Sequence, residues 1–199
     1  MRMRVSFPAG LVLCTALLGA CATPSHEEIQ ARFDAGLKSY DAGDYTSAYN
    51  TWHDIDEYDL AALRNVALML RKGQGVEKDP KAALRMMLAA ADLGLVTAMA
   101  DAGEMIADGE AGPPDIPAAI VWLARAVEGG HPIAAFRLAK IYDEGTAVPR
   151  NLKEARRLYR IAADAGIADA ARRLAELDAP APAPAPPPAA QGPLPPVAH

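Results

Sequence analysis

The chain has 199 residues, of which 51% are hydrophobic and 23% are charged, so it can bury a sizeable core. Acidic residues outnumber basic residues by 25 to 20, which gives a formal net charge of −5 at pH 7. A net negative surface disfavours binding to nucleic acid and to anionic lipid.

The first 20 residues are typical of a secretory signal peptide. Arg2 and Arg4 precede an apolar run at 11–18 that is too short to span a bilayer. The sequence Leu-Gly-Ala-Cys at 18–21 resembles a bacterial lipobox, in which the cysteine is lipidated and becomes the first mature residue. We expect a signal peptide at 1–20, acylation of Cys21 with chains such as palmitate, and a short linker at 21–24. The alternative is a cleaved signal with an incidental cysteine.

The lipobox resemblance also predicts a location. Position 22 is Ala22 rather than aspartate, which implies sorting to the outer membrane of a Gram-negative cell, with the chain facing the periplasm. Processing would remove Cys14 and leave Cys21 alone, so we expect no internal disulfide. It would also remove two of the 20 basic residues, so that 18 stand against 25 acidic residues and the mature net charge is −7.

We predict a helical hairpin over residues 25–60. Ser25 and Glu28 can form a capping box that opens a helix through Tyr40, a turn follows at 43–44, and a second helix is expected at 45–55. The hairpin resembles a degenerate tetratricopeptide unit. The residues near that pattern's usual positions are Gly36, Tyr40, Ala48 and Trp52. We expect it to cap the membrane end of the molecule.

One pattern then occurs three times at an interval of 36 residues, over residues 63–170. The matching positions are Gly73, Gly109 and Gly145; Asp79, Asp115 and Asn151; Ala83, Ala119 and Ala155; Ala90, Ala126 and Ala162; Gly94, Gly130 and Gly166; and Ala98, Ala134 and Ala170. A fixed repeat of this length predicts a stacked helical array.

Each unit predicts two amphipathic helices, which in unit one are Ala62–Lys72 and Pro80–Asp92. Asp79 caps the second helix, and in unit three Asn151 and Glu154 predict a capping box. Gly94, Gly130 and Gly166 are expected to end the second helices. Alanines form the close contacts, and larger residues fill the core. These larger residues share two positions: Met86, Trp122 and Leu158, and Met69, Met105 and Ile141. For Trp122, core packing is preferred over a binding role.

The run from Ala62 through Gly73-Gln74-Gly75-Val76, Asp79, Ala83 and Ala90 to Gly94 and Ala98 resembles the Sel-one-like repeat (SLR). Tyr142 matches the tyrosine that this pattern places before the loop glycine, whereas Leu70 and Ile106 depart from it, and loops two and three deviate from the loop motif. The resemblance implies an all-α fold, a right-handed α-solenoid of antiparallel helix hairpins. It also implies a scaffold or adaptor without enzymatic activity.

The three units and a capping helix account for residues 61–178. The capping helix is expected at 167–177, with Arg172 and Arg173 exposed and Leu174 and Leu177 facing inward. Nine prolines follow in residues 179–199, which predict a disordered tail. The tail is either a spacer or a ligand segment for peptidoglycan or another envelope protein.

The sequence contains no catalytic or metal-binding pattern, and no cofactor is expected. The histidines at 26, 53, 131 and 199 are too scattered for a metal site, and His131 is interpreted as a helix-start residue. The acidic run at 54–59 lacks the glycine of an EF-hand, which favours a solvated turn with Asp59 as a cap. Gly73-Gln74-Gly75 lacks the lysine of a phosphate-binding loop.

In the fold implied by the resemblance, the first helices of the units line the concave side. Their non-core residues are the predicted partner-binding positions: Arg64, Asn65, Leu68, Arg71, Asp101, Glu104, Asp108, Phe136, Arg137, Lys140 and Glu144. Their charges change from basic in unit one to acidic in unit two and mixed in unit three. Two interpretations follow: ion pairs between adjacent helices, or a groove that selects a peptide of complementary charge.

The function predicted from these observations is an outer-membrane-anchored, periplasmic scaffold that binds an unidentified envelope protein. One alternative is an envelope structural protein that contacts peptidoglycan or exported polysaccharide. A second is an enzyme acting on cell-wall material or β-lactams, which the lack of catalytic groups and disulfides disfavours.

Overall fold

The computed structural model describes residues 23–179, a range that contains nine α-helices and no strand. The helices are α1 (His26–Asp41), α2 (Tyr45–His53), α3 (Leu60–Lys72), α4 (Pro80–Asp92), α5 (Val96–Asp108), α6 (Ile116–Glu128), α7 (Pro132–Glu144), α8 (Leu152–Asp164) and α9 (Ala168–Asp178). The predicted signal peptide, Cys21 and residues 180–199 lie outside the described range. Within that range no helix has the length and apolar character needed to cross a membrane.

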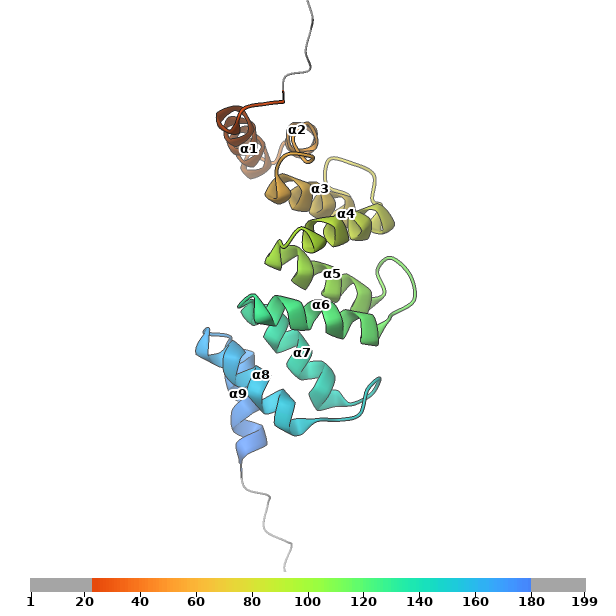
Figure 1. Cartoon of the computed structure of the whole chain (residues 1–199), viewed down its shortest axis with the longest axis vertical. Coiled ribbons are helices and arrows are strands. Elements are labelled where there is room, and N and C mark those ends of the chain that lie inside the picture. Colours follow the sequence, from red (N-terminus) through yellow and green to blue (C-terminus); the bar gives the residue numbers. More distant parts are fainter. Residues whose placement is uncertain (1–22, 180–199) are drawn as a thin grey trace, which may run out of the picture.

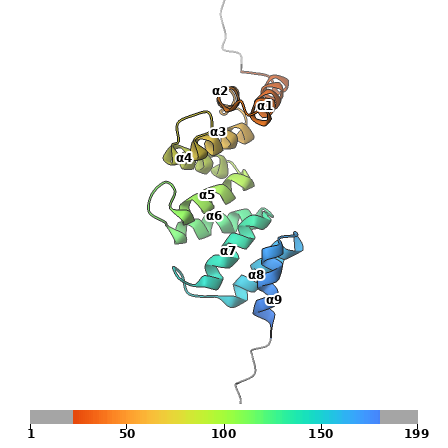
Figure 2. The ribbon, with the colours of Figure 1, turned by 180° about the vertical axis from the view of Figure 1, so that it is seen from behind.

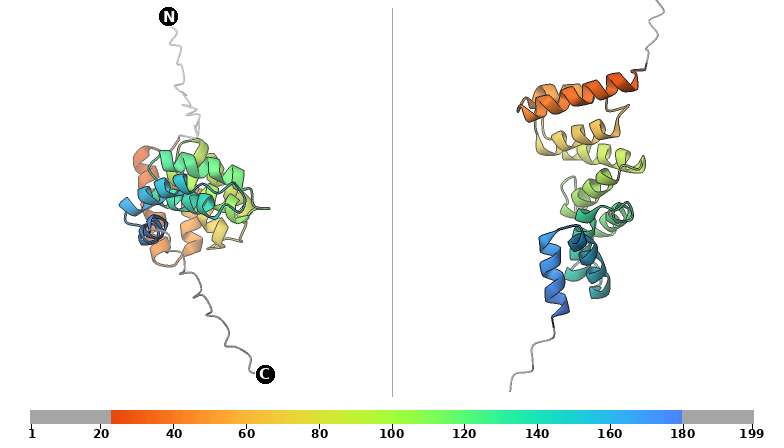
Figure 3. Two further views of the ribbon diagram at one scale, coloured as in Figure 1. Left: turned by 90° about the horizontal axis from the view of Figure 1, so that it is seen from below. Right: turned by 90° about the vertical axis from the view of Figure 1, so that its left-hand side faces the viewer.

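The helices stack in chain order along one axis (Figure 1). Each packs against the helix before it and the helix after it, and α1 and α9 lie at opposite ends of the array (Figure 3). The loops after α3, α5 and α7 all project from one edge, which is also visible from behind (Figure 2). This arrangement confirms the predicted all-α solenoid. Below, unit one is α3 and α4, unit two is α5 and α6, and unit three is α7 and α8.

The 36-residue periodicity reappears in the backbone. Helices α3 to α8 contain 13 residues each. The first helix of each unit ends at a glycine with positive φ, at 73°, 69° and 63° for Gly73, Gly109 and Gly145. A residue that has a Cβ is strained at positive φ. Glycine has no Cβ and therefore ends the helix at little cost.

Each second helix begins after a capping side chain, as predicted. The Oδ1 atoms of Asp79, Asp115 and Asn151 accept hydrogen bonds from the backbone N–H three residues later, at 2.9, 3.0 and 3.1 Å. The predicted capping box in unit three is wrong in its second half. The Glu154 carboxylate accepts hydrogen bonds from the Arg157 guanidinium, with Nε at 3.0 Å, and therefore does not reach back to the backbone of Asn151.

The repeated alanines form the contacts between helices. Ala83, Ala90, Ala98 and their equivalents one and two repeats later are at most 1% exposed. The backbones therefore approach closely at these positions, and a bulky side chain would overpack the contact.

The larger core residues differ in part from the prediction. Met69 and Met105 are buried as expected, but Ile141 is half-buried. Of the residues predicted to share a second core position, only Leu158 is buried. The next residue along each second helix is buried in all three units: Met87, Leu123 and Tyr159. Each of these pairs consists of two adjacent apolar residues, so helical periodicity does not distinguish which one faces inward.

Trp122 is one of the half-buried residues. It packs against the core on one side, and the guanidinium carbon of Arg125 lies 4.5 Å from its ring centroid on the other. A cation above an indole face is attracted by the negative charge of the ring face. Trp122 is therefore mainly a packing residue, and the Arg125 guanidinium lies over its ring.

The N-terminal hairpin covers the start of the array, and the capping box of Ser25 is confirmed. The Trp52 side chain is buried, and its Nε1 donates to the Phe33 carbonyl at 3.1 Å. Gly36 faces this ring, because a Cβ at Gly36 would lie 2.5 Å from Nε1 of the indole. Helix α2 ends at His53 rather than at the predicted residue 55. Turns at 54–58 instead place the Ile55 side chain in the core.

The Gly73-Gln74-Gly75 sequence has a structural role at this end. The Tyr40 hydroxyl donates to Oε1 of Gln74 at 3.2 Å. Gly75 has φ +71°, and a Cβ there would collide with the backbone of Tyr45. Loop one of unit one therefore packs directly against the N-terminal hairpin.

Helix α9 closes the other end. Leu174 and Leu177 pack against the core, as predicted, and Arg172 is exposed. Arg173 is only partly exposed, because its guanidinium turns onto Asp143 of α7, with Nε 2.6 Å from Oδ2. A charged pair thus joins the last helix to the array in addition to the apolar contacts.

The capping role of His131 makes stability depend on pH. Its Nδ1 accepts a hydrogen bond from the N–H of Ala134 at 3.2 Å, and burial lowers the pKa of the imidazole, against an opposing effect of the Asp101 carboxylate. A group whose pKa is lower in the folded state stabilises the fold above its unfolded pKa of about 6.5, and this contribution is lost as pH falls through the folded pKa. Protonation also removes the acceptor, and a capping bond contributes about 0.5–2 kcal/mol.

We therefore expect the free energy of unfolding to fall more between pH 7.5 and pH 5 in the natural chain than in a His131→Asn variant. Asparagine keeps the cap, as Asn151 does in unit three, but does not titrate. Chemical denaturation of both proteins at each pH measures the difference. Equal losses in the two proteins would contradict this role.

Candidate functional site

The eleven predicted partner-binding residues lie on α3, α5 and α7, whose outward side we call the first-helix face. All of them are at least partly exposed. Five are held in ion pairs between different units: Arg64, Arg71, Asp101, Glu104 and Arg137. The others line grooves between neighbouring first helices.

The ion pairs connect each first helix to the next. Nε of Arg64 on α3 lies 2.6 Å from Oδ2 of Asp101 on α5. Glu104 on α5 pairs with Arg137 on α7. The first of the two interpretations, ion pairing between adjacent units, is therefore confirmed for these positions. Partly buried pairs of this kind hold one arrangement of the helices better than exposed pairs do.

Sequence reasoning missed Glu110, which lies in loop two directly after Gly109. Its carboxylate accepts two hydrogen bonds from the Arg71 guanidinium, with Nε at 2.7 Å from Oε2. These bonds lower the pKa of Glu110 and raise the pKa of Arg71. Arg71 is also 3.9 Å from Glu104, so it bridges the seam between α3 and α5. The missed signal was the carboxylate next to the glycine that ends α5.

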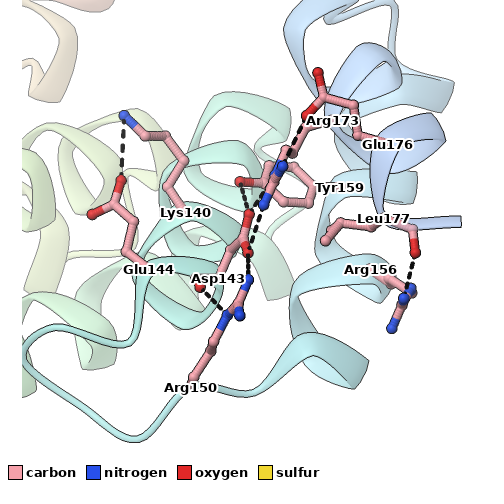
Figure 4. A network of polar contacts seen from close by, with 9 residues as sticks. All are labelled: Lys140, Asp143, Glu144, Arg150, Arg156, Tyr159, Arg173, Glu176 and Leu177. Carbon is pink, nitrogen blue, oxygen red and sulfur yellow. Dashed lines mark hydrogen bonds and ion pairs between the residues drawn. The ribbon is translucent and has the colours of Figure 1, made fainter. Parts of the chain in front are cut away.

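Sequence reasoning also missed Asp143, whose carboxylate is buried between α7, loop three, α8 and α9 (Figure 4). Arg173 donates from Nε to Oδ2 at 2.6 Å and from Nη2 to Oδ1 at 3.1 Å, and Arg150 donates to Oδ1 at 3.1 Å. Arg150 also donates to the Asp143 carbonyl at 2.6 Å. The hydrogen bonds from Arg173 and Arg150 hold the pKa of Asp143 below its usual range.

Tyr159 completes this network. Its hydroxyl donates to Oδ2 of Asp143 at 3.4 Å, and burial raises the pKa of Tyr159 to about 12. The phenol therefore stays protonated at neutral pH and can donate this hydrogen bond. An aspartate at a position that carries Arg71 and Ala107 in the other units was the available sequence signal.

Three grooves lie along the first-helix face. The α5–α7 groove has a volume of about 190 Å³ and is lined by Glu104, Ala107, Asp108, Ile116, Leu123, Arg137, Lys140, Ile141 and Glu144. The α7–α9 groove, of about 450 Å³, includes Phe136, Lys140, Glu144 and the Asp143 network. The α1–α3 groove, of about 200 Å³, includes Asn65 and Leu68. The face is therefore an interrupted furrow, in which ion pairs alternate with open spaces.

Residues 23–179 contain no cluster of three side chains placed to hold a metal ion. No buried side-chain nitrogen or oxygen in the described range lacks a hydrogen-bond partner. In the acidic turn, Asp59 caps α3, with Oδ1 2.7 Å from the N–H of Ala62, as predicted. Asp56 does not fit the predicted solvated turn, since it is buried against Nδ1 of His53 at 2.7 Å.

Removing the Asp143 carboxylate tests how firmly α9 is attached. An Asp143→Ala variant leaves Arg173, Arg150 and the Tyr159 hydroxyl without their shared acceptor. Because hydrogen bonds to charged groups contribute about 1.5–3 kcal/mol, we expect a loss of roughly that size in the free energy of unfolding. Hydrogen exchange should also become faster in α9 before it does in α5.

The matched control is Asp169→Ala, which removes a carboxylate paired only with the exposed Arg172 at 2.7 Å. Exposed pairs contribute about 0–1 kcal/mol, so this change should be small. Equal effects of the two substitutions would show that the Asp143 network does not stabilise the cap.

Comparison with known proteins places this geometry in a family. The Sel1 repeat profile matches residues 60–95, 96–131 and 132–167, which together form more than half of the chain. Each matched span starts at or directly beside the first residue of α3, α5 or α7. No curated protein matches the chain.

Solved structures show the same fold. A Sel1 repeat protein from Oxalobacter formigenes is 30% identical with a TM-score of 0.67, and the match covers 72% of this chain and 59% of that one. The protective antigen c5321 of uropathogenic Escherichia coli, which has an SLR fold, is 22% identical with a TM-score of 0.70, covering 75% and 33%. Cysteine rich protein B of Helicobacter pylori is 18% identical with a TM-score of 0.52, covering 63% and 96%.

The chain thus spans less than two thirds of the first two of these proteins. Three consecutive profile matches, a helix pair for each match and the shared solenoid lead to one conclusion. The chain belongs to the Sel1 repeat family.

Proposed function

We propose that this protein is a membrane-anchored, non-enzymatic scaffold that binds a segment of an envelope protein along its first-helix face. Sel1 repeat proteins are generally scaffolds for protein–protein interaction, and their fold is typically non-catalytic. The observation that carries the proposal is the furrow itself. Ion pairs bridge α3 to α5 and α5 to α7, and beside them Ile116 and Ile141 remain partly exposed between α5 and α7.

The chemistry of this furrow suits a polypeptide ligand. Recognition of a peptide by a helical array requires apolar pockets for anchor side chains and charged groups at the rim that fix register. Ile116 and Ile141 supply apolar surface in the α5–α7 groove, and Asp108, Lys140 and Glu144 supply charge at its edge. The paired residues, such as Arg64 and Asp101, keep the helices at a fixed spacing.

The proposed anchor is acylated Cys21, with the array in the periplasm at the inner surface of the outer membrane. Its support is the lipobox resemblance at 18–21. Residues 22–25 span at most about 14 Å when fully extended, so α1 would start close to the bilayer. Several acyl chains hold a protein far more firmly than one, because each buried methylene adds about 0.8 kcal/mol.

Photocrosslinking in cells tests the binding face. Probes replace Asp108, Lys140 and Glu144, which are exposed on the first-helix face, and control probes replace Glu128 and Arg160, which are exposed on second helices. We expect the first set to capture one defined protein and the control set to capture none. Capture from both sets would contradict binding at the first-helix face. No capture from either set, while the chain sediments with purified sacculi, would contradict the scaffold proposal and favour a contact with peptidoglycan.

A second experiment tests the anchor independently of the partner. We expect Cys21→Ser to abolish incorporation of labelled palmitate and to move the protein out of the membrane fraction. The control is Cys14→Ser, which alters a cysteine within the segment expected to be removed, and it should keep both label and location. Membrane association of the Cys21→Ser variant at the natural level would contradict the anchor.

A further inference from the structure

One position on the first-helix face differs in kind between the three units. It is Arg71 in unit one, Ala107 in unit two and Asp143 in unit three. Arg71 pairs with Glu104 and Glu110 across the seam between α3 and α5. Asp143 pairs with Arg173 across the seam between α7 and α9. Only Ala107 carries no side chain long enough to bridge the units. The α5–α7 groove therefore stays open at the place where a charged side chain bridges the other seams.

Four of the nine residues that line this groove are apolar, and the other five are charged. Its lining includes Ala107 of α5, Ile116 and Leu123 of α6, and Ile141 of α7. Leu123 belongs to the core and is 1% exposed, so the groove reaches down to the packed interior. Pockets for whole small-molecule ligands usually measure about 300–1,000 Å³. A groove of about 190 Å³ is smaller and has the capacity of a single large side chain.

The rim carries an uneven set of charges. Glu104 is already paired with Arg137, and Lys140 lies 3.9 Å from Glu144. Asp108 has no ion-pair partner among residues 23–179, and it is exposed at the edge of the groove. An incoming cation would therefore find an unneutralised carboxylate beside an apolar pocket, whereas an incoming anion would be repelled by it.

We infer that the α5–α7 groove binds one apolar anchor side chain of a protein partner, such as leucine, methionine or phenylalanine, and that Asp108 binds a lysine or arginine next to that anchor. This inference rests on the proposed function and specifies the partner's chemistry. Apolar anchors in desolvated pockets dominate the energy of most protein interfaces, and the charge at the rim selects among partners.

The repeat supplies substitutions that should not disturb the fold. Ala107→Arg places in unit two the residue that unit one carries as Arg71, and it fills the groove. Ala89→Arg is the matched control. Ala89 is exposed on α4, and the equivalent residue in unit two is Arg125. Asp108→Lys reverses the rim charge with the residue that unit one carries as Lys72, and a lysine in the last turn of a helix favours the helix dipole.

The test uses the full-length chain purified in detergent and a random peptide library displayed on phage. We expect the natural chain to select peptides in which a large apolar residue adjoins lysine or arginine. For a selected peptide, Ala107→Arg should weaken binding at least about tenfold and Ala89→Arg less than about twofold, because loss of one buried apolar side chain amounts to a factor of that order. Asp108→Lys should weaken the same peptide and favour a copy with glutamate in place of its basic residue.

The inference is wrong if Ala107→Arg and Ala89→Arg bind the selected peptide equally, or if Asp108→Lys leaves the preference for basic residues unchanged. Selection of proline-rich peptides similar to residues 180–199 would instead assign the groove to the chain's own tail. The crosslinking experiment distinguishes a failure of this inference from a failure of the proposed scaffold function. Capture at the first-helix probes that persists in Ala107→Arg would leave the scaffold function standing and overturn this groove as its anchor site.

Discussion

Close contact between helices at the repeated alanines is the constraint on which the rest of the structure depends. Alanines such as Ala90, Ala126 and Ala162 are fully buried in equivalent places. A single pair of 13-residue helices cannot bury its apolar surface alone, so each unit needs its neighbours, and the core becomes continuous along the array. Because the same alanines are buried in every unit, the first helices recur at a regular interval along the chain.

Regular spacing turns the first-helix face into a row of equivalent positions whose side chains can vary. One such position is occupied by Arg71, Ala107 and Asp143 in the three units. Arg71 bridges α3 and α5, Ala107 leaves the α5–α7 groove open, and the buried Asp143 binds Arg173 of the last helix. The backbone is unaffected by these differences, since α3, α5 and α7 have the same length. The fold therefore depends on the buried alanines and on the glycines that end helices, while the side chains of the first-helix face differ between units.

The charges on this face separate into two groups with different consequences. Partly buried pairs such as Glu104 and Arg137 satisfy each other, so a ligand that used one of them would have to break an existing interaction. Asp108 and Lys140 remain accessible beside apolar surface. Ion pairing thus accounts for much of the charge pattern on this face, and the proposed recognition site is the α5–α7 groove.

The sequence by itself determined the solenoid, the limits of its helices and most of its caps, because glycine, proline and capping residues act within one turn of the chain. It also placed the predicted partner-binding positions on one face, because helical periodicity is a local property. Only the tertiary structure decided which of those residues are paired, which member of Trp122-Leu123 faces the core, and that Arg173 turns onto Asp143. These outcomes depend on contacts between residues 30 or more positions apart, or on how helices rotate against each other, and neither is encoded in local periodicity.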